Sequence, residues 1–208
     1  MQSLTSKLVS IIPQKGKRNY YKLIFNSGDI FSVSKDVLVS NNIQTGQDLS
    51  SENLLKIQRE VLLIEIKNKV LNLLKYRDRS KKELETQLYH KGYKKSDIKH
   101  VINELEIKGL INDEKFARQL ALHLINVKML GRIAVVNKFR KHAIDFNLLN
   151  QILDELYSKF KPNMLIKKLV EKKFKSNLPD IRRNKKLLNF LKNKGFGWAE
   201  ISDALNDF

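Results

Sequence analysis

The sequence predicts a mainly α-helical protein of three tandem helical repeats in an elongated array, preceded by a small β-containing unit. Three observations predict this fold. A helix–glycine–helix pattern around Gly92 returns around Ala143 and Gly195, and these positions are nearly evenly spaced along the 208 residues. After residue 51, apolar residues recur at three- and four-residue steps, as on one face of a helix. Before residue 51, apolar and aromatic runs alternate with polar turns, as in strands.

Residues 1–50 form the predicted β-containing unit. The runs 20–25 and 30–33 flank Asn26-Ser27-Gly28-Asp29, a turn sequence typical of a β-hairpin. Residues 34–41 are predicted to form a short helix with Ser34 as its N-cap. These features predict a sheet with at least one hairpin at this end of the chain.

The first repeat is assigned to residues 51–109. It begins with a long helix, predicted over 52–76 because this stretch has neither Gly nor Pro and has helical apolar spacing. A helix pair follows, and Ser80 with Glu83 has the spacing of a capping box, which places a helix start at Ser80. Gly92 suits the left-handed residue just past a helix end. The long helix is expected to pack on this pair.

The second and third repeats are assigned to residues 110–160 and 161–208. Asn112 or Asp113 is expected to cap the first helix of the second repeat, and Pro162 suits the first turn of the third. Ala143 stands where the other repeats have glycine. A left-handed backbone at this alanine would cost on the order of 1 kcal/mol.

Apolar residues occupy the same offsets from the central residue of each repeat. They lie eight and four residues before it, and one, six, ten and thirteen residues after it. The predicted core positions are Leu84, Leu88, Tyr93, Ile98, Ile102 and Leu105; Val135, Phe139, Ile144, Leu149, Leu153 and Leu156; and Leu187, Leu191, Phe196, Ile201, Leu205 and Phe208. Any amphipathic helix pair shows some such matches, but apolar residues at all six offsets around three central residues favour a repeat. Because each repeat is small for independent stability, neighbours are expected to pack together.

The composition indicates a folded protein with an anionic partner. Lys and Arg total 40 against 22 Asp and Glu, a formal charge of +18, and the excess is largest after Lys159. Such an excess attracts a polyanion, most simply nucleic acid, although a solvated lysine-rich surface is the alternative. With no cysteine, no long apolar run and no signal-peptide start, we expect a cytoplasmic protein without a membrane span.

Basic residues return near a helix start in each repeat, and a linear array would align them in a positive stripe. A helix N-terminus also offers backbone N–H groups to phosphate. Any single lysine is more simply explained as a solvated side chain. The recurrence therefore supports binding by the set of basic residues and not by each member. The candidate DNA- or filament-binding residues are Arg77, Arg79, Lys81, Lys82, Lys94 and Lys95 in the first repeat, Arg132, Lys138, Arg140 and Lys141 in the second, and Arg182, Arg183, Lys185 and Lys186 in the third.

No catalytic, metal or cofactor site is predicted. The four histidines, His90, His100, His123 and His142, lack metal-ligand spacing and are expected at the surface or flanking helices. The carboxylate pair Asp113-Glu114 is expected at a helix start, where negative charge suits the helix dipole. Isolated glycines exclude a phosphate-binding loop. We therefore expect a protein that is not an enzyme.

Three aromatic residues lie just after the helix-ending glycines Gly92 and Gly195, and their position has two interpretations. Tyr93, Phe196 and Trp198 could stack on nucleic-acid bases. For Tyr93 and Phe196, a hydrophobic contact that caps the preceding helix is the stronger interpretation, because each directly follows a helix-ending glycine. Trp198 has no counterpart in the other repeats, and its role stays open.

From about residue 55 onward the chain resembles the RecX family, the regulators of the RecA recombinase. The resemblance rests on Arg79-Ser80 with Glu83-Leu84, on Lys91-Gly92-Tyr93 and, most specifically, on Gly109-Leu110-Ile111-Asn112-Asp113-Glu114-Lys115-Phe116-Ala117. It implies three tandem three-helix units, similar to winged-helix cores, that form a curved body. The chain departs from the family pattern at Lys128, where arginines usually precede the second-repeat glycine, and at His142-Ala143, where the family has Lys-Gly.

The resemblance also implies a partner. Family members bind along the groove of the RecA–DNA filament and alter its growth, strand exchange and co-protease activity, usually by inhibition. The expected partners are thus the RecA filament and, weakly and in a salt-dependent manner, single- and double-stranded DNA, bound by a monomer with no cofactor. The alternative is a stand-alone DNA-binding protein, such as a transcriptional regulator, that places a helix in a DNA groove.

Overall fold

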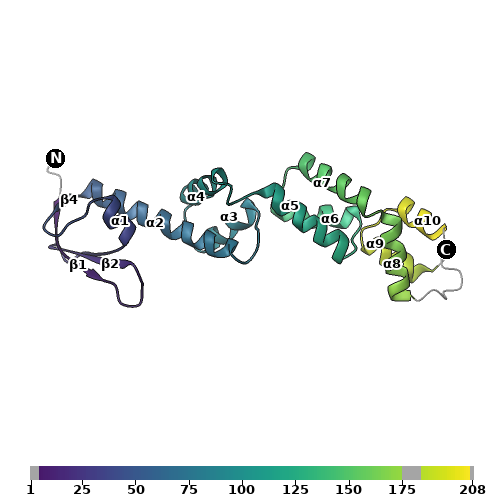
Figure 1. Ribbon diagram of the computed structural model, residues 1–208, viewed down its shortest axis with the longest axis horizontal. Helices are drawn as coiled ribbons and strands as arrows, with labels where there is room; N and C mark the ends of the chain where they lie inside the picture. The colour runs from purple at the N-terminus through teal and green to yellow at the C-terminus, as the bar shows by residue number, and fades with distance from the viewer. Residues whose placement is uncertain (1–4, 175–183, 207–208) are drawn as a thin grey trace. The chain divides into compact units, whose positions relative to one another are not determined.

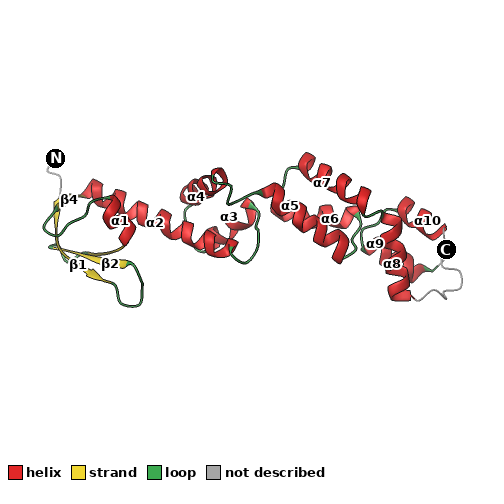
Figure 2. Cartoon of the chain, in the orientation of Figure 1, coloured by secondary structure: helices red, strands yellow, loops and turns green. Residues whose placement is uncertain are grey.

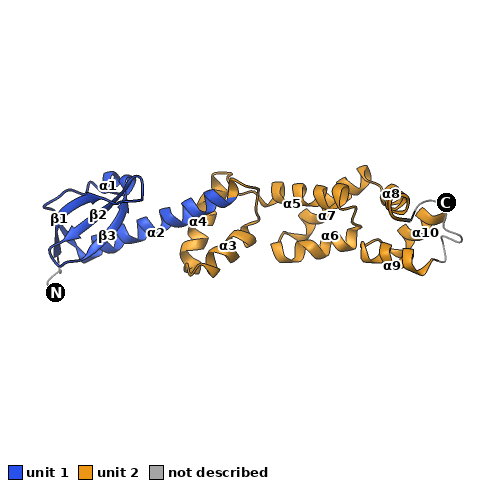
Figure 3. Cartoon of the chain, turned by 90° about the horizontal axis from the view of Figure 1, so that it is seen from below, with its two compact units in different colours: residues 1–73 blue, residues 74–208 orange. Residues whose placement is uncertain are grey.

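The chain is mainly helical, with a small antiparallel sheet at its N-terminal end (Figure 1, Figure 2). The computed structural model describes residues 5–174 and 184–206. It divides into two compact units, residues 1–73 and 74–208, which Figure 3 colours separately. In the described part of the chain, no helix is both long and apolar enough to cross a membrane.

The first unit contains a four-stranded antiparallel sheet. Its strands are β1 (Thr5–Pro13), β2 (Tyr20–Phe25), β3 (Ile30–Ser34) and β4 (Asp48–Ser50), in the order β3-β2-β1-β4. The predicted hairpin is confirmed, since Ile24 at the end of β2 pairs with Ile30 at the start of β3. The short helix α1 (Lys35–Ser40) is confirmed as well, and the Ser34 side chain caps it by accepting from Val37 N–H.

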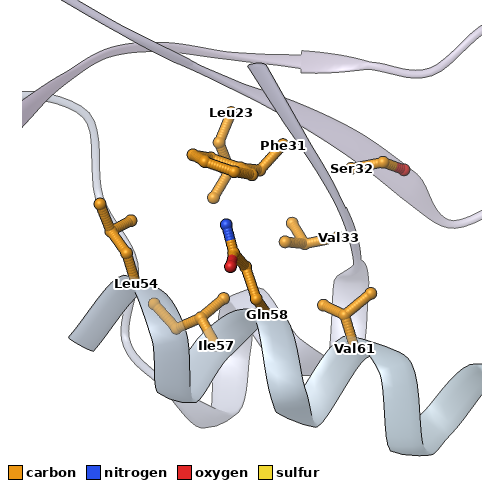
Figure 4. Close-up of a pocket in the computed structure, with 8 residues that line it drawn as sticks. All are labelled: Leu23, Phe31, Ser32, Val33, Leu54, Ile57, Gln58 and Val61. Carbon is orange, nitrogen blue, oxygen red and sulfur yellow. The ribbon is translucent and has the colours of Figure 1, made fainter. Parts of the chain in front are cut away.

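The long helix α2 (Ser51–Leu74) supplies one wall of the core of this first unit. Ile57 is buried with strand residues such as Leu23 and Val33, and Leu54 and Val61 pack at the edge of the same cluster. Figure 4 shows these side chains facing each other around a cavity of about 100 Å³. The core of the N-terminal unit therefore continues past residue 50, into the helix assigned to the first repeat.

The second unit is entirely helical in its described residues. Its elements are α3 (Lys81–His90), α4 (Lys95–Ile107), α5 (Asp113–Leu122), a π-helical turn η1 (His123–Val127), α6 (Arg132–Phe139), a 3₁₀ turn η2 (Arg140–His142), α7 (Phe146–Lys159), α8 (Pro162–Phe174), α9 (Lys185–Asn193) and α10 (Trp198–Asn206). The predicted helix starts are confirmed: Ser80 caps α3, Asn112 caps α5 and Pro162 is the first residue of α8. The π turn was not predicted. The assignment of repeat boundaries stays a prediction.

The apolar offsets of the three repeats mark the helical core. Every predicted position before the central residue is buried, as is every described position six or more residues after it. Phe208 lies outside the described residues. The position one residue after varies, since Phe196 is buried while Tyr93 and Ile144 are half-buried. Spacing alone thus identified the inward face of six helices.

The central residue of each repeat has a left-handed backbone, with φ of 88° at Gly92, 51° at Ala143 and 87° at Gly195. The helices that end before Gly92 and Gly195 close through the expected pattern. The N–H of Tyr93 donates to the carbonyl of Leu88, and that of Phe196 donates to the carbonyl of Leu191. Their surroundings differ. A Cβ at Gly92 would meet nothing within 4 Å, whereas one at Gly195 would collide with Ala134.

Helices α5 to α10 share one hydrophobic core, which runs from Phe116 to Leu205. The second and third predicted repeats meet at a contact we call the glycine junction, made of Gly131, Ala134, Lys194 and Gly195. Gly131 N–H donates to the carbonyl of Lys194 at 2.9 Å, and Ile133 N–H donates to that of Gly195 at 3.2 Å. A Cβ on Gly131 would lie 2.6 Å from the nitrogen of Phe196. Only glycine permits this approach of two backbones.

The first and second predicted repeats meet at a different contact, the polar junction of Ser80, Lys81, Asp113 and His142. The Ser80 hydroxyl lies 3.1 Å from Nδ1 of His142, and the Lys81 backbone N–H donates to the Asp113 carboxylate at 2.8 Å. His142 flanks a helix as expected but is only 7% exposed. Asp113 stands at a helix start as expected, and it also caps α3 from outside, which the sequence did not indicate.

Candidate nucleic-acid interface

Three of the predicted basic residues in the first repeat are held by carboxylates. Arg77 and Arg79 both pair with Glu83 in the first turn of α3, with N–O distances of 2.5 Å. Burial raises the pKa of Glu83, but the hydrogen bonds and charges of the two arginines outweigh it, so this pKa is lowered overall. Lys81 pairs with Glu106 at 2.8 Å, and that hydrogen bond raises the pKa of Lys81. These three cations stabilise α3 and its surroundings, and their charge is largely compensated.

Other cations of this repeat line a groove between α3 and α4, which we call the α3–α4 groove. Lys82 and Lys95, both predicted from sequence, line it together with Lys99, which was missed, and Tyr89. Its volume is about 410 Å³, and one carboxylate, that of Glu85, is among its described lining residues. Lys94 is exposed at the N-cap of α4. The structure therefore brings together two predicted lysines that are 13 residues apart in sequence.

Tyr89 gives this groove a face suited to nucleic acid. Its side chain is 54% exposed, and the Lys95 ammonium lies 5.3 Å from the ring centroid. A ring that is exposed beside cations can stack on a base while the lysines hold phosphates. The sequence carried a signal for Tyr89 only indirectly, as an aromatic residue in the last turn of a helix with lysines at its start.

Lys82 occupies a position that helix stability does not favour. It lies in the first turn of α3, where the helix dipole is positive and a cation costs roughly 0.3–1 kcal/mol. Among the described residues its ammonium has no ion-pair partner. Lys185 and Lys186 lie in the same way in the first turn of α9, exposed, with Asn184 as the N-cap. Such cations are explained better by an anionic partner than by the fold.

In the second repeat, the basic residue at the helix start is held by a carboxylate. Arg132 begins α6, but it pairs with Asp154 at 2.5 Å and donates to Asn150 at 3.0 Å. Lys138, Arg140 and Lys141 are exposed at the end of α6 and in η2, where cations complement the helix dipole. A basic residue thus stands at the start of α3, α6 and α9, but in α6 its charge is compensated by Asp154. Arg182 and Arg183 lie outside the described residues.

The aromatic residues that follow the central positions fall into two groups, one buried and one exposed. Phe196 is buried in the core shared by α5 to α10, so it serves the capping contact. Trp198 begins α10, is 61% exposed, and has the Lys192 ammonium 5.4 Å from its ring. This pair repeats the chemistry of Tyr89 and Lys95 at the other end of the helical unit's sequence.

Together, the fold and the groove define a class: mainly helical proteins with a small N-terminal sheet and a cationic, aromatic-lined groove, with the charge to bind a polyanion. Comparison with known proteins gives the family. Residues 67–105, which include the whole α3–α4 groove, match the family model for the first three-helix domain of RecX. The chain is 34% identical over 137 residues to the regulatory protein RecX of Pelodictyon phaeoclathratiforme, covering 65% of this chain and 83% of that one.

This chain belongs to the RecX family. The regulatory protein RecX of Clostridioides difficile is 27% identical over 198 residues, covering 93% of this chain and 92% of that one. Two solved structures share the fold. A crystal structure of regulatory protein RecX has a TM-score of 0.73 at 22% identity and covers 97% of this chain and 99% of that chain. RecX from Lactobacillus salivarius has a TM-score of 0.59 at 27% identity, with coverage of 70% and 95%.

Proposed function

We propose that this protein is a non-enzymatic regulator of homologous recombination and DNA repair, which binds the RecA–DNA filament and inhibits its assembly, strand exchange and co-protease activity. It acts as a monomer in the cytoplasm, where the recombinase works. Membership of the RecX family supports the partner, because the resemblance found in the sequence implies RecA. The observation that carries the proposal is the α3–α4 groove, since it lies within the segment that matches the family model.

The groove supports a polyanionic partner through its charge and its position. Lys82, Lys95 and Lys99 face a single carboxylate, that of Glu85, among the described lining residues. Lysine binds phosphate as a mobile point charge, so three of them tolerate the varied geometry of a backbone wrapped by protein. The exposed Tyr89 adds a surface for a base or for an arginine of the recombinase.

The first experiment removes the groove's charge. The variant Lys82→Glu with Lys95→Glu should co-sediment with RecA filaments on single-stranded DNA at least about tenfold more weakly, since a tenfold change needs only about 1.4 kcal/mol. The matched control, Lys15→Glu with Lys161→Glu, reverses two exposed lysines elsewhere and should bind almost as the wild type does. Strand-exchange and ATPase assays should show inhibition lost in parallel. Unchanged filament affinity in a groove variant that is folded by circular dichroism would contradict the proposal.

A second experiment separates binding from stability at α9. Reversing Lys185 and Lys186 to Glu places negative charge in the first turn of a helix, which should raise the free energy of unfolding by about 0.5–1 kcal/mol. If these lysines contact the filament, the same variant should bind it more weakly. Urea unfolding and co-sedimentation measure the two effects. A variant that is stabilised and binds as tightly as the wild type would remove α9 from the interface.

The second candidate function is stand-alone binding to DNA, which the net charge of +18 favours. Binding to naked duplex that neutralises about five phosphates would give a slope near −4.5 for log affinity against log salt. Tight, sequence-specific duplex binding without recombinase would support this second function. Weak, salt-labile binding to naked DNA, with much tighter binding to filaments, would support the regulator.

A further inference from the structure

Four lysines that the repeat pattern did not single out line one pocket beside an aromatic ring. Lys128 follows the π turn η1, Lys172 and Lys173 lie in the last turn of α8, and Lys194 is the C-cap of α9. All four line a pocket of about 320 Å³ together with Phe190. We call this the cationic pocket. No carboxylate is among its described lining residues.

The glycine junction holds the cationic pocket in shape. The Lys194 ammonium donates to the backbone carbonyl of Lys128 at 3.0 Å, and the Lys194 carbonyl accepts from Gly131 N–H at 2.9 Å. Lys194 is thus fixed at both its backbone and its side chain. Lys173 is positioned as well, with its ammonium 3.9 Å from the centroid of the Phe190 ring. Two of the four cations are therefore ordered by the fold before any ligand arrives.

The electrostatics of the cationic pocket favour an anion. Burial lowers the pKa of Lys194, and the charges of Lys173, Lys128 and Lys172 lower it further. Helix C-termini attract cations, which accounts for Lys172 and Lys173 as individuals. It does not account for Lys128 and Lys194, which join them from two other segments in a pocket with no carboxylate among its described lining residues. Like charges gathered in this way cost free energy that a bound anion would recover.

We propose that the cationic pocket is a second anion-binding site, separate from the α3–α4 groove, and that it takes phosphate groups of the DNA backbone. It is a site for phosphate rather than for bases, because Lys173 covers the face of Phe190. The pocket borders the ends of α8 and α9 and not their starts, so it lacks the cradle of N–H groups that holds an isolated phosphate. Lysine ammonium groups alone suit a polyanion, whose binding gains from counterion release.

The test uses the full-length chain and a fluorescent single-stranded oligonucleotide without recombinase. Lys128→Gln with Lys172→Gln removes two exposed charges of the pocket and keeps the carbonyl that accepts from Lys194. For single strands each lost phosphate contact reduces the salt slope by about 0.7, so the slope of log affinity against log salt should become shallower by about 1.4. Affinity at low salt should fall about tenfold. The control, Lys15→Gln with Lys161→Gln, should keep the wild-type slope.

A slope equal to that of the wild type, in a variant folded by circular dichroism, would overturn the proposal. A competition arm with inorganic tripolyphosphate identifies the source of the phosphate. If tripolyphosphate displaces the oligonucleotide from the wild type only at much higher concentration, DNA is the ligand. If it binds more tightly than the oligonucleotide, and the pocket variant loses that binding, then the DNA assignment is wrong.

The site depends on the proposed function only in naming DNA as the anion. Because the assay contains no recombinase, its failure leaves the filament regulator untouched. Equally, a groove variant that keeps full filament affinity would contradict the regulator's interface and would leave the pocket's slope measurement unaffected.

Discussion

The polar junction and the glycine junction join equivalent positions of successive repeats, but they do so through different kinds of contact. In the polar junction the N-cap of α3, Ser80, contacts His142, which directly precedes the left-handed Ala143. In the glycine junction the N-cap of α6, Gly131, contacts Lys194, which directly precedes the left-handed Gly195. The first contact joins two side chains and the second joins two backbones.

The difference shows that one pair of residues at a junction can decide how tightly two adjacent repeats are joined. Without a Cβ at either glycine, the backbones approach until their peptide groups bond directly, and α5 to α10 then form a single core. Ser80 and His142 keep the backbones apart and replace the peptide contact by a side-chain hydrogen bond to an imidazole, a group that titrates near neutral pH. We therefore expect the glycine junction to resist unfolding and the polar junction to respond to pH.

The largest expected effect is that of Gly195→Ala. The new methyl group would meet the nitrogen and Cβ of Ala134 far inside van der Waals contact, at a φ of 87° that alanine adopts at a cost. The free energy of unfolding should fall by about 3 kcal/mol or more, as measured by urea denaturation.

Gly92→Ala is the matched control for the glycine junction. It has the same backbone, with φ of 88°, and no atom within 4 Å of the added Cβ, so only about 1 kcal/mol should be lost. Equal losses in the two variants would show that backbone strain, and not the close approach to Ala134, decides the effect.

An intermediate effect is expected for Ser80→Ala in the polar junction. The serine hydroxyl caps α3 by accepting from Glu83 N–H at 3.2 Å, and it also contacts the buried His142. Losing a cap costs about 1 kcal/mol, and leaving a buried polar group unpaired costs about 1 kcal/mol more, for a total near 2 kcal/mol.

Asn184→Ala separates these two contributions, because Asn184 caps α9 by accepting from Leu187 N–H at 3.1 Å and, among the described residues, makes no second contact like that of Ser80 with His142. It should lose only about 1 kcal/mol. A Ser80→Ala variant no less stable than Asn184→Ala would mean that the contact with His142 contributes nothing.

The smallest expected effect is a pH dependence at the polar junction. Burial lowers the pKa of His142 below its usual 6.5; the charges of Lys141 and Arg77 lower it further, while those of Glu83 and Asp113 raise it. Between the lowered pKa and 6.5 the unfolded chain binds more protons at this site. The free energy of unfolding should therefore rise with pH through this window and fall as the solution becomes more acidic.

Urea unfolding between pH 5.5 and 7.5 measures this slope, and His142→Asn should flatten it. Asp113 acts in the opposite sense and in another window. Burial raises its pKa above 3.8, against the hydrogen bond and charge of Lys81, so its contribution falls as pH rises through that lower range. A slope between pH 5.5 and 7.5 that survives His142→Asn would place the titrating group elsewhere.

Much of the helical unit followed from the sequence because local rules act within a few residues. Capping chemistry at Ser80 and Asn112, the apolar offsets and the left-handed position at Ala143 each need only a short stretch of chain. These features identified helix starts, the buried faces and the strained alanine. The family resemblance rested on the same local motifs.

The binding site was harder to predict, because whether a basic residue is held in an ion pair depends on which carboxylate the tertiary fold brings near it. Arg77, Arg79 and Arg132 look like their neighbours in sequence, but Glu83 and Asp154 hold them in ion pairs. Lys82 and Lys95 meet in one groove only because α3 and α4 pack together. Lys128 and Lys194 are 66 residues apart, and no local pattern relates them.

The sequence by itself determined the hairpin, the main helix starts, the inward face of six helices and the family, because periodicity and capping are properties of neighbouring residues. The tertiary structure alone decided which cations remain available to a partner and how tightly successive repeats are joined. Both depend on contacts between segments distant in the chain: a carboxylate reaching an arginine, or two glycine backbones meeting where a single methyl group would keep them apart.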